Sequence, residues 1–142
     1  MSEFQSASIS LEADATSMAL EPVWKYVHGD YELLEKLGQG SYGLVLKAKH
    51  RESGTVCAIK HIKNVFYNAY EAIKILREVH IMRKLSCMKT NIFTSKLIDV
   101  IVPFRNQENT TSLKESKLLF EEIFLVQEYF DSDMSQIIKD AG

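Results

Sequence analysis

Residues 38–43 read Gly-Gln-Gly-Ser-Tyr-Gly and match the pattern Gly-x-Gly-x-x-Gly. Loops of this kind cradle phosphates with backbone amides, because a residue without a Cβ lets the backbone approach an anion closely. In dinucleotide-binding domains a helix follows the loop, whereas in a second class of nucleotide-binding loop a strand follows. Residues 44–49 alternate in polarity like a strand, which favours the second class. Taken alone, the glycines fit a ligand-free hairpin turn equally well.

Lys60 is the first residue that could act on such phosphates. It ends a predicted strand over residues 55–60, and because side chains alternate along a strand, Val56, Ala58 and Lys60 share one face. A lysine in the middle of a sheet is costly to bury unless it has an anionic partner. A lone lysine usually extends its stem into solvent instead. Phosphates beside the glycine loop would supply the partner.

Glu78 is a second candidate partner for Lys60. It lies within a predicted helix over residues 68–85, where Asn68 is the expected N-cap and Glu71 has the spacing of a capping box. A lone glutamate in this position would by default be a solvated acid bonded to Lys74. The order of glycine loop, strand, Lys60 and then Glu78 on the next helix is much more specific than any one part. The apolar positions with helical spacing are Ile73, Leu76, Val79 or His80, and Leu85.

The elements that must position these residues indicate an α+β fold. Strands are predicted over residues 31–37, where Gly38 is expected to end the strand, and over 44–49, 55–60, 96–102 and 122–127. Short connections join the first three strands, which is typical of an antiparallel meander. We expect a five-stranded antiparallel sheet with one long helix packed on one face. A polar surface loop over 104–119 and a short closing helix over 133–139 complete the prediction.

Composition excludes several classes of protein. The 142 residues carry 17 Lys+Arg and 19 Asp+Glu, a net charge of −2, and 46% are hydrophobic, which is typical of one globular domain. The longest apolar run has four residues, and no basic excess suggests nucleic acid, so we expect neither membrane nor nucleic-acid partners. The start lacks the features of a secretory or transit peptide, which predicts a cytoplasmic or nuclear location.

Two further features of the composition concern the cysteines and the N-terminus. The two cysteines, Cys57 and Cys87, form no disulfide framework or metal motif, so we expect no metal ligands in this sequence. Residues 1–22 hold four acids and neither lysine nor arginine. We therefore expect a mobile acidic leader over residues 1–22, followed by the domain over residues 23–142.

Taken together, these motifs resemble those of a eukaryotic protein kinase. Residues 38–45 resemble its glycine-rich loop, and residues 57–60, Cys-Ala-Ile-Lys, are similar to its Val-Ala-Ile-Lys motif. Residues 76–79, Leu-Arg-Glu-Val, resemble the middle of its C-helix, and residues 124–130 resemble strand five running into the hinge. The finer resemblance, through residues 76–79 and 126–134, is to the mitogen-activated protein kinase branch. The expected fold is thus a kinase N-lobe with the hinge and the start of a C-lobe.

The resemblance implies ATP as the cofactor and assigns roles to the matched residues. The loop amides would cover the phosphates, and Lys60, paired with Glu78 as the catalytic pair, would contact the α- and β-phosphates. Val45 and Ala58 would pack on the adenine. Gln127 would be the gatekeeper at the back of the adenine slot. The residues implied in nucleotide binding are Gly38, Gly40, Ser41, Gly43, Val45, Ala58, Lys60, Gln127, Glu128 and Phe130 through their backbone, and Asp133 at the ribose.

The sequence departs from the family pattern after the hinge. It contains no His-Arg-Asp, Asp-Phe-Gly or Ala-Pro-Glu segment, and these supply the catalytic base and the Mg²⁺ ligands in the family. We therefore expect an inactive N-lobe that uses Mg²⁺ only through residues outside this sequence. The missing C-lobe, protein substrates with Ser/Thr acceptors and an upstream activating kinase are the implied partners.

Two other functions stay open beside a fragment of a serine/threonine kinase. A short natural isoform could act as a non-catalytic binding or decoy module, with at most weak ATP binding. A dinucleotide-binding enzyme is the third, and the strand predicted after Gly43 argues against it.

Overall fold

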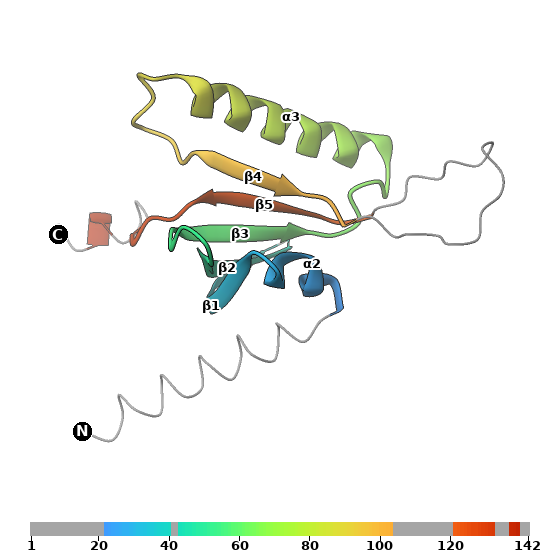
Figure 1. The fold of residues 1–142 in the computed structure, drawn as a ribbon. Helices are drawn as coiled ribbons and strands as arrows, with labels where there is room; N and C mark the ends of the chain where they lie inside the picture. The colour runs from blue at the N-terminus through green and yellow to red at the C-terminus, as the bar shows by residue number, and fades with distance from the viewer. Residues whose placement is uncertain (1–21, 41–42, 104–120, 133–136, 140–142) are drawn as a thin grey trace.

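The computed structural model describes residues 22–40, 43–103, 121–132 and 137–139, and within them the fold is one five-stranded antiparallel sheet with helices on both faces (Figure 1). The strand order is β1-β2-β3-β5-β4. The predicted α+β class and the antiparallel sheet are confirmed. The strands are β1 (Tyr31–Gly40), β2 (Gly43–His50), β3 (Val56–Ile62), β4 (Leu97–Ile101) and β5 (Ile123–Glu128).

The first three strands form the predicted meander, but β1 is longer than expected. The prediction that Gly38 ends the strand is wrong, because β1 continues to Gly40. Gly38 pairs with Val45 and Gly40 pairs with Gly43, so β2 satisfies backbone groups that a loop would leave to water. The pairing of β1 with β2 shifts its register at two places along β1. The glycine motif is therefore the closing end of a β1–β2 hairpin.

One face of the sheet, here called the back face, is covered by the N-terminal segment. The 3₁₀-helix η1 (Pro22–Trp24) and the helix α2 (Lys25–His28) lie on it, and the sequence did not predict either one. Trp24 and Val27 are fully buried there, and the Trp24 ring contacts His61 and Phe124. The back face thus has its own aromatic core.

The opposite face, here called the front face, carries the helix α3 (Ala69–Cys87), which Figure 1 shows running above β4. Asn68 caps it as predicted, its side chain accepting a hydrogen bond from the Glu71 N–H at 2.9 Å. Ile75 and Val79 pack against the front-face core. The expected contact stripe is partly wrong, because Leu76 is 69% exposed and Ile73 is 46% exposed.

The second half of the chain completes the sheet. β5 inserts between β3 and β4, and residues 123–126 are all buried because both faces of this strand are covered. The predicted acidic leader and the polar loop lie outside the described residues, apart from Pro22. Of the predicted closing helix, only residues 137–139 are described, and they are helical. None of the helices in the described segments is long and apolar enough to cross a membrane.

Candidate functional site

The register of β2 and β3 brings three of the predicted site residues onto the front face. Val45 lies opposite Lys60, and Ala58 follows two residues away on the same side of β3. The intervening residues Cys57 and Ile59 are buried in the back-face core, as the alternation requires. The facing of the predicted strand is therefore confirmed, although β3 runs over residues 56–62 and not over residues 55–60.

Lys60 and Glu78 form the predicted ion pair. The Lys60 Nζ lies 2.7 Å from the Glu78 Oε1, and the two side chains are 21% and 36% exposed. Ile75 and Val79 pack on the sheet one turn before Glu78 and directly after it, which turns the carboxylate toward β3. A short, partly buried pair of this kind orients both groups, because each supplies the other's strongest hydrogen-bond partner.

The three glycines of the motif have different structural roles. Gly43 has φ +131°, and a Cβ there would lie 1.8 Å from the His61 carbonyl oxygen. Only glycine therefore lets β2 begin this close to β3. Among the described residues, a Cβ at Gly38 or Gly40 would meet no atom within 4 Å, so these residues leave space beside the two glycines. Ser41 lies outside the described residues.

The end of β5 and the segment that follows it lie beside Ala58. Gln127 pairs with Ala58 across β3 and β5. The Glu128 N–H donates to the Lys96 carbonyl at 2.9 Å, and the Lys96 N–H donates to the Glu128 Oε2 at 3.3 Å, which fixes the start of this segment against β4. Phe130 is 58% exposed. Asp133 lies outside the described residues, so its predicted role is untested.

Three residues beside the segment that follows β5 were not identified from the sequence, namely Lys47, Glu35 and Tyr129. The Lys47 Nζ lies 2.9 Å from the Glu35 Oε1 and 4.5 Å from the centre of the Tyr129 ring. Hydrogen bonding to Glu35 and then to Tyr129 raises the pKa of Lys47, so its charge is firmly retained. Alternation from Val45 placed Lys47 on the correct face, but no sequence signal linked it to residue 129.

The described residues offer little to a metal ion. Within the described segments, no group of three or more His, Cys, Asp or Glu side chains is arranged to hold one. The face instead presents two held cations, Lys60 and Lys47, together with small and apolar neighbours and backbone at its edge. Such a surface suits an anion attached to a flat, largely apolar group.

Comparison with known proteins gives one family. The family model described as the protein kinase domain matches residues 31–141. Mitogen-activated protein kinase 11 of Oryza sativa subsp. japonica is 38% identical over 109 residues, covering 77% of this chain and 16% of that protein. Mitogen-activated protein kinase homolog 1 of Petunia hybrida is 33% identical over 109 residues, covering 77% of this chain and 24% of that protein. The chain thus spans about a quarter or less of the length of these relatives.

Proposed function

Because the chain belongs to the protein kinase domain family and is similar to mitogen-activated protein kinases, we propose that it is the ATP-binding N-lobe of a serine/threonine kinase. The observation that carries the proposal is the Lys60–Glu78 pair at 2.7 Å on the face shared with Val45 and Ala58. An oriented ammonium group beside the small and apolar residues Ala58 and Val45 suits the phosphates and the base of a nucleotide. The front face is the proposed nucleotide site.

The phosphates would lie between Lys60 and the end of the β1–β2 hairpin. Glu78 holds the ammonium group in place, so it does not have to reorganise when the phosphates arrive. The space that the described residues leave beside Gly38 and Gly40 gives room for phosphate oxygens near the backbone. These residues would bind and orient ATP, which supplies the phosphoryl group.

The adenine would lie against Val45 and Ala58, with Gln127 at the back of the slot beside Ala58. The edge of the ring would meet the backbone of residues 128–130. The Glu128 N–H already donates to Lys96, so Glu128 would contribute its carbonyl, and Phe130 would contribute its N–H. The role of Glu128 in this proposal is supported by its hydrogen bond to Lys96.

Phosphoryl transfer requires groups beyond those in the 142 residues. No His-Arg-Asp or Asp-Phe-Gly segment occurs in the sequence, and the described residues do not fit a metal ion. We propose that a C-terminal lobe supplies the base and the Mg²⁺ ligands, so the chain alone transfers no phosphate. Protein substrates and an activating kinase are proposed partners of the completed enzyme, in the cytoplasm or nucleus.

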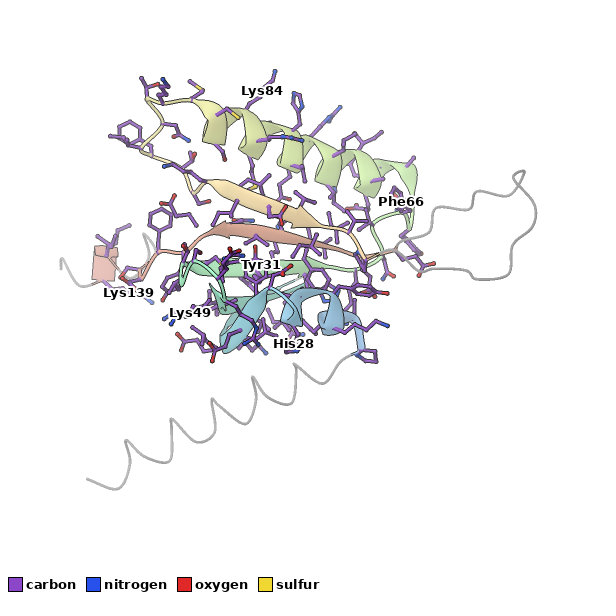
Figure 2. The ribbon with its side chains drawn as sticks, in the orientation of Figure 1. His28, Tyr31, Lys49, Phe66, Lys84 and Lys139 are labelled. Atoms are coloured by element: carbon purple, nitrogen blue, oxygen red, sulfur yellow. The ribbon has the colours of Figure 1, made fainter. Side chains whose placement is uncertain are left out.

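The proposal is tested by titrating the 142-residue chain with a fluorescent ATP analogue. Lys60→Met should weaken binding about tenfold, since one charge-assisted contact is worth about 1.4 kcal/mol or more. Lys84→Met is the matched control, because Figure 2 shows Lys84 on the side of α3 that points away from the sheet. Equal affinities for the two variants, or no binding by the wild type, would refute the proposal.

A further inference from the structure

Lys47 connects three parts of the front face that are distant in sequence. Glu35 comes from β1, Lys47 from β2, and Tyr129 directly follows β5. The Lys47 ammonium group lies 2.9 Å from the Glu35 carboxylate and 4.5 Å from the centre of the Tyr129 ring. The Lys47 side chain is 23% exposed and that of Glu35 is 44% exposed, so the ion pair is partly open to solvent. The lysine thus bridges the glycine hairpin to the segment after β5.

Hydrogen bonds and the Lys47 bridge hold the segment after β5 from two sides. On one side, Lys96 exchanges two hydrogen bonds with Glu128. On the other side, Lys47 holds the ring of Tyr129, which stands between Glu128 and Phe130. These two neighbours are the residues whose backbone would meet the adenine edge. A shift of Tyr129 would therefore move the groups that bind the ring.

We infer that Lys47 is a positioning residue for nucleotide binding, holding the Tyr129 ring so that the backbone of residues 128–130 stays aligned with the adenine. The inference rests on the proposed function. Lys47 lies opposite Ala58, the residue proposed to pack on the adenine, so the bridge spans the roof of the same slot. A cation held over an aromatic face is attracted by the negative charge of that face, more strongly where water is excluded. Loss of the bridge should therefore weaken ATP binding about three- to tenfold.

The alternative is that Lys47 makes only a surface salt bridge with Glu35. Exposed pairs of this kind contribute little to stability and nothing to the affinity for a ligand. The chain offers a matched control in Lys49, two residues along β2 and exposed. A merely stabilising role would be seen in thermal unfolding and would leave nucleotide affinity unchanged.

The first measurement is affinity for the fluorescent ATP analogue. Lys47→Met and Tyr129→Leu should each weaken binding about three- to tenfold, and the double variant should bind no more weakly than either single one. Lys47→Arg, which keeps the cation, and Lys49→Met should stay within about twofold of the wild type. Unchanged affinity in Lys47→Met, with wild-type binding intact, would overturn the inference.

The second measurement is amide hydrogen exchange in the nucleotide-free chain. Lys47→Met should speed exchange at residues 128–130 and leave exchange in α3 unchanged, because the Lys47 bridge contacts Tyr129 and not the helix. If the wild type binds no ATP analogue, the proposed function fails, and this measurement still decides whether Lys47 holds the segment. Exchange equal to that of Lys49→Met would overturn the inference.

Discussion

Gly43→Ala adds only one methyl group, yet we expect it to cause a large loss of stability. The Gly43 φ of +131° lies in a region that residues with a side chain rarely adopt, at a cost of about 1–3 kcal/mol. The added methyl group of Gly43→Ala would also lie 1.8 Å from the His61 carbonyl oxygen and 3.0 Å from its carbon. Both neighbours are backbone atoms of β3, so no side-chain rotation relieves the overlap.

Relief therefore requires β3 to move away from β2 at the residue next to Lys60. Crowding that forces a backbone shift costs a further 1–3 kcal/mol, roughly, which gives a total of about 2–6 kcal/mol. Domains of this size are stable by about 5–15 kcal/mol, so much of the stability is lost. A loss of about 3 kcal/mol lowers the Tm of a small domain by more than about 10 °C.

The assay is urea unfolding followed by circular dichroism, with Gly40→Ala as the control. Gly40 belongs to the same motif, but a Cβ there meets no atom of the described part of the chain within 4 Å. Its substitution should change stability by no more than about 1 kcal/mol, in either direction. If Gly43→Ala were as stable as Gly40→Ala, the close approach of β2 to β3 would be wrong.

Three further predictions concern stability. A double-mutant cycle on Lys60→Met and Glu78→Gln should give a coupling of about 1–2 kcal/mol in urea unfolding, and a value near zero would mean that the pair is not formed in solution. Asn68→Ala should cost about 1 kcal/mol through the lost N-cap, with α3 exchanging faster at its first turn; unchanged exchange there would contradict the cap. Burial, with a smaller effect of Asp99, raises the pKa of Tyr31 to about 12. Stability should therefore fall as the pH rises from 10 to 12, because the unfolded tyrosine ionises first, and solvent screening keeps the slope below the full value of about 1.4 kcal/mol per pH unit. Tyr31→Phe should remove this slope in unfolding measured across that range, and an unchanged slope would assign it to other groups.

The residues that determine the site were largely predictable because they obey local rules. Strand alternation placed Ala58 and Lys60 on one face, and the N-cap residue Asn68 fixed where α3 begins. Helical spacing alone did not show which side of α3 meets the sheet. Ile75 and Val79 make that contact, while Leu76 faces outward, because the helix is oriented by tertiary packing.

Features that depend on long-range contacts were not predictable. The segment around Trp24 has too short a helical run for periodicity to reveal it, yet it covers the back face by packing on His61 and Phe124. The Lys47–Tyr129 contact joins residues on opposite sides of β3, and no spacing rule links them. Such contacts follow from the sheet order β1-β2-β3-β5-β4, which sequence patterns do not specify.

The central claim is that Lys60 binds the phosphates of ATP on the front face. The most direct test is calorimetric titration of the 142-residue chain and of Lys60→Met with ATP and with adenosine, which lacks phosphates. We predict that Lys60→Met weakens ATP binding about tenfold and leaves adenosine binding within about twofold. Equal weakening of both ligands, or of neither, would contradict the account.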